Sequence, residues 1–363
     1  MKKLAGRPQK VKTDVVGLDV HKDMIAYCHL DAEGNEVSSG KLKATVEHVL
    51  GMLRQATQLR PVHVTMEASG GIWYLYDALV EVLGVDFVHV AHPKRLRAIA
   101  NSSEKNDAND AYWLAFYTYE GILPQSWIPT PAYREIRIAT RARRESVFQQ
   151  TRATVLLKSF LRQMGQRPPG QRLDSQASMA WLKELTAATP GAVGVALKVL
   201  IRRLEAARAD VALWEEEIER MAMDLPEVEL LRKRLPGVGP ILSATIVAET
   251  GPLTRFTCGR ALGKYTGLVP SDHSTGGRTR HGGMTREGSA HLRWALGQAV
   301  MCCLRHSRAL GSGPESAVAR WVDRKSRRVP RGKARVAAAR KLATAIWWLA
   351  HNPDTFNPFK AFA

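Results

Sequence analysis

The chain has few cysteines and no long apolar run. Its four cysteines, Cys28, Cys258, Cys302 and Cys303, form no CxxC pair and show no spacing typical of a zinc site. We therefore expect reduced thiols, as in cytoplasmic proteins, rather than a disulfide framework. No stretch approaches 18 uninterrupted apolar residues and no signal peptide is visible. These absences exclude the common membrane-spanning classes and predict a cytoplasmic protein with no membrane partner.

Acidic residues are scarce relative to basic ones. The chain of 363 residues has 53 Lys and Arg against 34 Asp and Glu, a formal net charge of +19. A charge of this sign and size suits nucleic acid or an anionic membrane surface. Because no amphipathic anchor or lipidation motif accompanies it, we expect nucleic acid to be the partner. The length suffices for two or three domains that each bury a core.

The first third of the chain has the pattern of an α/β domain. Apolar periodicity predicts three antiparallel strands and then helix, strand, helix, strand and helix. A turn rich in Asp, Gly and Asn joins the second strand to the third. The predicted elements are 15–20, 24–30, 36–43, 46–53, 62–67, 72–83, 85–90 and 105–116.

Four acidic residues lie at the ends or starts of these predicted strands and helices. Asp19 lies near the end of the first strand, Glu67 ends the fourth, and Asp107 and Asp110 open the last helix, where their spacing puts them on one face. Taken singly, each acid is an ordinary loop, cap or helix-start residue. Their joint occurrence predicts a ribonuclease H–like fold of the RuvC type. In it the four carboxylates would bind Mg²⁺, with Mn²⁺ as the alternative, and act on a phosphodiester.

The middle of the chain is predicted to form two long helices. Prolines at 124, 129 and 131 mark a linker out of the first domain, and a basic helix follows over 134–164. The second helix, 192–223, has apolar residues in heptads, a pattern that predicts a coiled coil or an antiparallel helical stalk. These helices could pair within one chain or between two chains. The heptad residues are Leu197, Leu204, Val211 and Ile218 at one position and Leu200, Ala207, Trp214 and Met221 at the other.

The last third is predicted to be mostly helical, with one short glycine motif. Gly237 and Gly239 lie in the segment Leu-Pro-Gly-Val-Gly-Pro, between two helical stretches. Such a turn resembles a helix–hairpin–helix element, in which backbone N–H groups approach a DNA phosphate closely. A plain turn between helices also uses glycine, so both interpretations stand.

A glycine-rich loop follows at 271–283, with the hydroxyl groups of Ser274 and Thr275 at its centre. A solvated surface loop is the ordinary interpretation. A loop that presents a hydroxyl among arginines is also the way a nucleophile would be brought to a phosphate. Basic residues in and beyond the loop are predicted to contact nucleic acid, although a solvated helix face is the alternative for the last two: Arg278, Arg280, Arg286, Arg293, Arg327 and Arg328.

Together these motifs resemble the DEDD insertion-sequence transposases, the IS110 family, which also includes the Piv-type DNA invertases. The resemblance covers roughly 14–304. It rests on Gly-Leu-Asp-Val-His-Lys, Met-Glu-Ala-Ser-Gly, Lys-Asn-Asp-Ala-Asn-Asp, Pro-Gly-Val-Gly-Pro, Tyr-Thr-Gly-Leu-Val-Pro and Ser-Thr-Gly-Gly. It implies an N-terminal RuvC-like domain, a coiled-coil segment, and a C-terminal transposase domain that supplies a catalytic serine.

The resemblance also implies roles for individual residues. The four acids match those of the family without gaps, as metal ligands and catalytic residues. The family nucleophile stands directly before the loop glycine, a place that Thr275 occupies here, with Ser274 one residue earlier. We choose Ser274, because a primary hydroxyl is less hindered than a secondary one, and keep Thr275 as the alternative.

The family activity would be Mg²⁺-dependent site-specific strand exchange through a covalent phosphoserine–DNA intermediate. The implied partners are donor and target DNA and a structured noncoding bridge RNA that pairs with both. Because the acids and the loop are far apart in the sequence, they could meet between two subunits, so we also expect a dimer or tetramer, at the bacterial nucleoid. The alternatives are a metal-only junction resolvase or nuclease, and a binding scaffold with a decayed active site, which the presence of all four acids disfavours. The predicted domains are a basic disordered arm, a RuvC-like domain, a helical linker with the coiled coil, and a transposase domain: 1–13, 14–125, 126–228 and 229–363.

Overall fold

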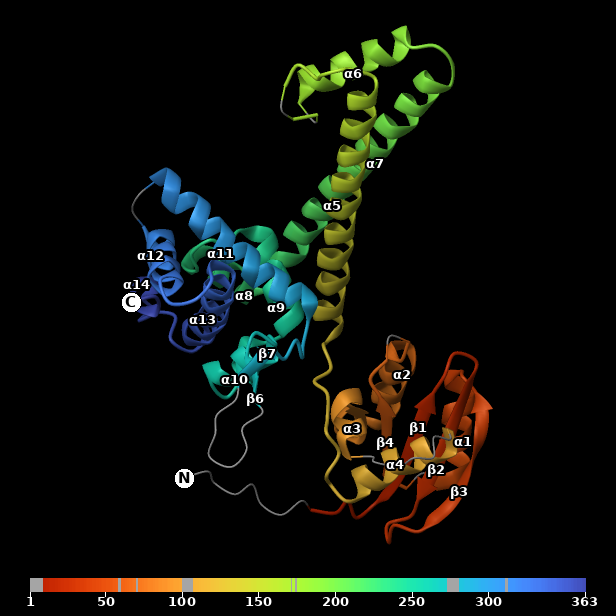
Figure 1. Cartoon of the computed structure of the whole chain (residues 1–363). Helices are drawn as coiled ribbons and strands as arrows, with labels where there is room; N and C mark the ends of the chain where they lie inside the picture. The colour runs from red at the N-terminus through yellow and green to blue at the C-terminus, as the bar shows by residue number, and fades with distance from the viewer. Residues whose placement is uncertain are drawn as a thin grey trace. The chain divides into compact units, whose positions relative to one another are not determined.

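The chain divides into two compact units, Met1–Ile128 and Pro129–Ala363, each of which we describe by itself (Figure 1). The second unit contains both the predicted linker, 126–228, from Pro129 onward, and the predicted transposase domain, and a boundary near 228 stays a prediction. The computed structural model describes 9–57, 60–69, 71–99, 107–170, 172–173, 175–272, 281–310 and 313–363. Some helix and strand ends are described by their backbone alone, among them Asp107.

In the described part of the first unit, five strands form one mixed sheet in the order β3-β2-β1-β4-β5. Strand β1 is antiparallel to β2 and parallel to β4, and β4 is parallel to β5. This mixed sheet is consistent with the predicted ribonuclease H–like fold. The strands are β1 (Asp14–Val20), β2 (Met24–Leu30), β3 (Glu36–Lys43), β4 (Val62–Glu67) and β5 (Val88–Ala91).

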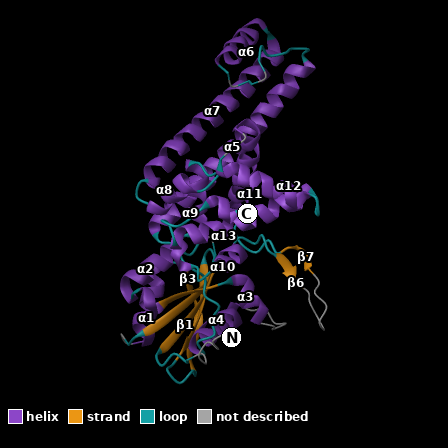
Figure 2. Ribbon diagram, turned by 90° about the vertical axis from the view of Figure 1, so that its left-hand side faces the viewer, coloured by secondary structure: helices purple, strands orange, loops and turns teal. Residues whose placement is uncertain are grey.

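Helices cover both faces of the sheet (Figure 2). Side chains of α1 (Val46–Thr57) and α2 (Trp73–Leu83) form a buried core with Val16 and Leu18 of β1. Helix α4 (Asp107–Tyr119) covers the other face, over Val15 and neighbouring residues of β2. The predicted order of strands and helices is confirmed. Two details were wrong: the start of the strand expected at 85–90 is a 3-10 turn (Val85–Phe87), and a short helix, α3 (Pro93–Ile99), precedes α4.

Helix α4 lies directly on β1 because position 17 is glycine. A Cβ atom at Gly17 would overlap the carbonyl oxygen of Ala111 and lie 2.7 Å from the backbone nitrogen of Ala115. At the other end of α4, the N–H of Val11 donates to the carbonyl oxygen of Tyr119 at 2.8 Å. Since Val11 precedes β1, α4 runs antiparallel to β1. The N-terminus of α4 therefore lies toward the carboxyl ends of β1 and β4.

The second unit begins with two long helices, α5 (Pro131–Gln163) and α7 (Gly191–Ala222), with α6 (Gln176–Ala188) at their far end (Figure 1). The two long helices run in opposite directions and pack against each other within one chain, through buried residues such as Leu157 and Leu204. Of the two predicted alternatives, pairing within one chain is therefore the one that α5 and α7 show. A coiled coil between subunits stays a prediction.

The rest of the second unit is mostly helical, as predicted. None of the helices that the structure describes is long and apolar enough to cross a bilayer. The elements are α8 (Pro226–Arg234), α9 (Pro240–Thr250), η2 (Leu253–Arg255), α10 (Gly259–Tyr265), β6 (Pro270–Asp272), β7 (His281–Met284), α11 (Ala290–Leu310), α12 (Pro314–Ser326), α13 (Arg331–His351) and α14 (Pro358–Ala361).

The Gly17 contact generates a stability prediction. Gly17→Ala should lower the free energy of unfolding of the first unit by about 1–3 kcal/mol, because the added methyl group forces α4 off the sheet. The matched control is Gly51→Ala in α1, where an added Cβ meets no atom within 4 Å. That change should be neutral or stabilising by up to about 1 kcal/mol. Urea denaturation measures both, and a Gly17→Ala protein as stable as wild type would contradict the close packing.

Candidate active site

Asp19 lies on the face of the sheet that α4 covers. Side chains alternate along a strand, so Asp19 shares its face with Gly17, which contacts α4. The Asp19 side chain is 15% exposed, and its Oδ2 lies 2.9 Å from Nε2 of His21. Asp19 therefore places a partly buried carboxylate near the end of β1.

Glu67 lies on the same face at the end of β4. Two residues earlier, the hydroxyl groups of Thr65 and Thr118 are hydrogen-bonded at 2.6 Å, which identifies this face as the one under α4. The parallel register pairs Leu18 with Met66, so the next residues, Asp19 and Glu67, are neighbours across the two strands. Adjacent strands lie about 4.8 Å apart. The strands thus bring these two acids together.

Asp110 and Asp107 approach the same edge from α4. Asp110 directly precedes Ala111, which lies against Gly17, and Asp107 begins the helix. Asp19 lies two residues beyond Gly17 along β1, and Asp107 lies four residues before Ala111 along α4. Because α4 runs antiparallel to β1, both steps lead about 6–7 Å in the same direction. The backbone therefore carries all four predicted acids to one edge of the sheet. The side chain of Asp107 is outside the described set.

The donor set at this edge suits a hard divalent cation. Carboxylate oxygens are the ligands that Mg²⁺ prefers in proteins, and grouped carboxylates repel one another unless a cation neutralises them. Among the described side chains, no group of three or more His, Cys, Asp or Glu is close enough to hold a metal ion. Asp107 is not among these described side chains.

The glycine-rich loop at 271–283, which we call the hydroxyl loop, belongs to the second unit. Ser274, Thr275, Arg278 and Arg280 fall in 273–280, outside the described residues. The loop leaves and returns through the antiparallel pair β6 and β7. Just beyond the pair, the N–H of Thr285 donates to the carbonyl oxygen of Val269 at 2.9 Å. The two ends of the loop are therefore held together.

Two family models match the chain. A model described as transposase, of the DEDD IS110 type, matches residues 16–166, and one described as transposase of the IS116/IS110/IS902 family matches 229–312. The first range contains the four acids and the second contains the glycine hairpin and the hydroxyl loop. The chain belongs to the IS110 family of DEDD transposases.

Relatives of full length support this assignment. A probable family 20 transposase of Pseudomonas aeruginosa is 26% identical over 351 residues, which are 94% of this chain and 98% of the relative. The transposase for insertion sequence element IS1111A of Coxiella burnetii is 23% identical and covers 94% of this chain and 91% of its own. The transposase for insertion sequence element IS1328 of Yersinia enterocolitica is 27% identical over 304 residues, 82% of this chain and 86% of its own.

This protein is therefore an insertion-sequence transposase, an enzyme whose substrates are DNA. DEDD transposases generally use a divalent metal, which agrees with the all-oxygen donor set of the four acids. The sequence prediction of the family and of the enzyme class is confirmed.

In the transposase, Arg293 fastens the base of the hydroxyl loop. Its Nη1 donates to the carbonyl oxygens of Gly288 at 2.9 Å and Arg286 at 3.2 Å. Arg286 itself is exposed and has a positive φ of 53°, an uncommon conformation for a residue with a side chain. Sequence analysis did not predict this structural role for Arg293. Contacts of Arg286 and Arg293 with nucleic acid stay predictions.

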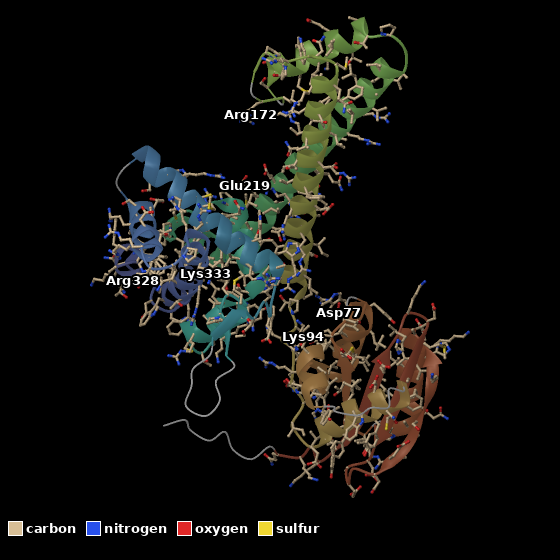
Figure 3. All side chains as sticks on the ribbon, viewed as in Figure 1. Asp77, Lys94, Arg172, Glu219, Arg328 and Lys333 are labelled. Atoms are coloured by element: carbon tan, nitrogen blue, oxygen red, sulfur yellow. The ribbon has the colours of Figure 1, made fainter. Side chains whose placement is uncertain are left out.

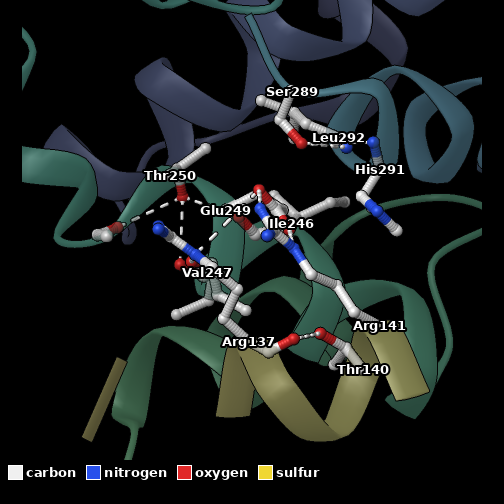
Figure 4. A network of polar contacts seen from close by, with 12 residues as sticks. Arg137, Thr140, Arg141, Ile246, Val247, Glu249, Thr250, Ser289, His291 and Leu292 are labelled. Atoms are coloured by element: carbon white, nitrogen blue, oxygen red, sulfur yellow. Dashed lines mark hydrogen bonds and ion pairs between the residues drawn. The ribbon is translucent and has the colours of Figure 1, made fainter. Parts of the chain in front are cut away.

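A buried carboxylate links the long helix α5 to the start of α11 (Figure 4). Glu249 of α9 is 2% exposed and accepts hydrogen bonds from Nε and Nη2 of Arg141 at 2.8 and 3.0 Å. Ser289, which also bonds to Glu249, accepts the backbone N–H groups of His291 and Leu292 at 3.1 and 3.2 Å. Glu249 therefore links α5, α9 and the segment that returns from the hydroxyl loop.

The surroundings of Glu249 keep it ionised. Burial by itself raises the pKa of this carboxyl. The hydrogen bonds and charge of Arg141, the hydrogen bond from Ser289 and the charge of Arg137 outweigh burial, and the pKa of Glu249 is lowered below its ordinary value. Sequence analysis missed this residue, although a single acid at the end of the apolar run Ile241–Glu249 is a signal of a buried ion pair.

The glycine hairpin between α8 and α9 has one packing glycine and one open glycine. Gly237 has a φ of +69°, and a Cβ there would lie 2.6 Å from the sulfur of Cys303 in α11. Gly239 has no atom within 4 Å of an added Cβ. A cleft of about 510 Å³ lies beside both glycines. The packing of Gly237 explains its identity without DNA. No such contact explains Gly239, and its approach to a DNA phosphate stays a prediction.

Arg327 and Arg328 lie at the C-terminal end of α12, where both are exposed. Figure 3 places Arg328 and Lys333 at the surface near the connection from α12 to α13. Within the described residues, neither arginine forms an ion pair. Their contact with nucleic acid stays a prediction, and no ion pair among the described residues competes with it.

Removing the Glu249 charge should destabilise the transposase in a pH-dependent way. Glu249→Gln should cost about 2–3 kcal/mol of unfolding free energy at pH 7, because it weakens charged hydrogen bonds at a buried site. The pKa of Glu249 is lowered in the folded protein. The stabilisation is therefore complete above the ordinary value of about 4.5 and is lost as the pH falls through the lowered value.

Chemical denaturation between pH 8 and pH 3 measures this difference. The control is Glu215→Gln in α7, which removes a carboxylate 44% exposed and paired with Arg143 of α5. It should cost less than about 1 kcal/mol. Equal effects of the two variants, or an effect of Glu249→Gln that grows as the pH falls, would contradict the assignment.

Proposed function

We propose that this transposase exchanges DNA strands through a covalent phosphoserine intermediate at a metal centre held by Asp19, Glu67, Asp107 and Asp110. The observation that carries the proposal is the convergence of β1, β4 and the start of α4 at one edge of the sheet. Mg²⁺, with Mn²⁺ as the alternative, would polarise the scissile phosphate when bound there. The carboxylates would hold the ion and orient the phosphate.

The nucleophile in this proposal is Ser274, with Thr275 as the alternative. The Ser274 hydroxyl oxygen attacks the scissile phosphorus and forms a P–O bond while the bond to the 3′ oxygen breaks. The proton of the hydroxyl ends on the 3′ oxygen through solvent. The 3′ hydroxyl of a second strand then attacks the phosphoserine and restores the serine. The number of phosphodiester bonds is conserved, so no ATP is needed.

The loop base would position this nucleophile. The β6–β7 pair, the Arg293 bonds and the Glu249 link hold both ends of the loop against the helices of the second unit. We assign Arg278, Arg280 and Arg286 to the charge of the attacked phosphate, since guanidinium groups pair well with phosphate oxygens.

We further propose that a structured noncoding bridge RNA selects donor and target DNA by pairing with both. The net charge of +19 and the exposed Arg327 and Arg328 supply cationic surface for RNA and DNA. The acids and the hydroxyl loop belong to different units of the chain. A dimer or tetramer, in which an acid centre meets a loop from another subunit, would complete the active site at the bacterial nucleoid.

The metal assignment predicts that Asp19→Asn abolishes divalent-metal-dependent strand cleavage while the protein stays folded, because the carboxylate contributes binding rather than packing. The matched control is Asp86→Asn, which removes an exposed acid of the same unit and should leave cleavage unchanged. A radiolabelled donor duplex with added Mg²⁺ or Mn²⁺ measures the activity. Wild-type cleavage by Asp19→Asn, or by the native enzyme in excess chelator, would refute the assignment.

The nucleophile assignment predicts that Ser274→Ala eliminates strand exchange and the covalent adduct but keeps DNA binding, because one hydroxyl and no charge is removed. Thr275→Ala should keep some of both activities. Denaturing gels of a labelled suicide substrate detect the adduct. Loss of the adduct in Thr275→Ala with its retention in Ser274→Ala would make Thr275 the nucleophile. Metal-dependent cleavage without any adduct in the native enzyme would favour the metal-only nuclease.

A further inference from the structure

A cleft of about 380 Å³ lies between α11 and α13, beside the base of the hydroxyl loop. Its volume is within the range of ligand pockets, about 300–1,000 Å³. Among the described residues, no Asp or Glu lines it. Leu268 is one of its lining residues, and those that α11 contributes are Arg293, Trp294, Gly297, Gln298 and Met301. We call it the Trp294 cleft.

Glycine at two places keeps the cleft open. Gly297 lies in the middle of the α11 stripe that lines the cleft, one turn from Arg293 and from Met301. Gly332 of α13 lines the opposite side. An added Cβ at either position meets no atom within 4 Å. Glycine inside a helix is less stable than alanine, so packing within the chain does not explain Gly297.

Two polar side chains of the cleft, those of Arg335 and Gln298, have groups without a hydrogen-bond partner among the described residues. The Nε of Arg335 is buried and has no hydrogen-bond partner, and the Arg335 guanidinium makes no ion pair within the described part of the chain. No described residue forms a hydrogen bond with the side chain of Gln298. A buried N–H without a partner is unfavourable, so an acceptor bound in the cleft would be stabilised by this group.

The walls of the cleft suit a flat heteroaromatic group. Trp294 contributes an indole ring that the Arg144 guanidinium contacts at 5.1 Å from its centroid. Leu268, Met301 and Val336 add apolar surface. An aromatic ring, an amide and an unpaired guanidinium together match an unstacked nucleobase and its adjoining phosphate.

We propose that the Trp294 cleft binds one unpaired nucleotide of the DNA strand that the hydroxyl loop attacks. The base would lie against Trp294 and bond to the Gln298 amide, and its phosphate would pair with Arg335. DNA is the favoured source because Arg293, which lines the cleft, also holds Arg286 and Gly288 at the base of the loop. This inference rests on the proposed function, in which exchanged strands must leave their first partners.

Equilibrium binding of the full chain to a labelled duplex with one unpaired nucleotide, against the same duplex fully paired, tests the cleft. The native protein should prefer the unpaired duplex by about tenfold, the scale of a base–aromatic stack. Gly297→Leu, which adds a side chain to the cleft at a position where a Cβ meets no atom within 4 Å, should reduce this preference to within about twofold. Arg335→Gln should do the same and reduce the salt dependence of binding by about one phosphate contact.

Matched controls separate the cleft from general effects. Gly51→Leu adds the same side chain to an open glycine of α1, and Arg340→Gln removes the same charge from an exposed residue of α13 outside the cleft. Both should keep the tenfold preference. Circular dichroism checks that Gly297→Leu is folded, and Arg335→Gln provides the second test if it is not.

Three outcomes would overturn the proposal. They are equal binding of the two duplexes by the native protein, an unchanged preference in both cleft variants, and loss of binding to a bulged RNA but not to the bulged DNA in those variants. The Ser274→Ala protein should keep the preference, since the assay needs no chemistry. A preference without any covalent adduct would refute the phosphoserine mechanism and leave the cleft in place, whereas an adduct without a preference would do the reverse.

Discussion

The contact between Gly17 and α4 sets the geometry of the proposed metal centre. Because a side chain at position 17 would overlap Ala111, the helix can lie flat on β1 only over a glycine. That contact sets how closely α4 approaches β1, the Val11–Tyr119 hydrogen bond sets its direction, and the Thr65–Thr118 hydrogen bond holds it over β4 as well. The acids of the helix therefore reach the strand ends where Asp19 and Glu67 lie.

In the second unit, contacts within the chain likewise hold the ends of the hydroxyl loop in place. In the proposed mechanism the ends of this loop must be held in place for its hydroxyl group to reach a phosphate. Arg293 holds the end of the loop through hydrogen bonds to backbone carbonyl groups. Glu249 links the segment after the loop to α5, through its bonds with Ser289 and Arg141. The two units have separate cores, so each half of the proposed active site is built independently. Only the substrate and the arrangement of subunits need to bring the halves together.

Much of the first unit could be predicted from the sequence because its signals are local. Apolar strands with Asp19 near the end of one and Glu67 at the end of the other identify the sheet edge without any knowledge of tertiary contacts. Other features depend on partners far along the chain. Gly237 resembles a phosphate-binding glycine until its contact with α11 is seen, and Arg293 bonds to carbonyl groups, which carry no side-chain signal. The helix α3 was missed because it is short and basic, with too few apolar residues to form a periodic pattern.

The central claim is that one divalent ion centre forms at the edge defined by β1, β4 and α4. Anomalous diffraction from crystals soaked in Mn²⁺ tests it most directly. The account predicts an anomalous peak within about 2.5 Å of carboxylate oxygens from Asp19 and from at least one acid of α4. It also predicts that the peak is absent from crystals of Asp19→Asn. A peak bound elsewhere on the chain, or one that persists unchanged in Asp19→Asn, would contradict the account.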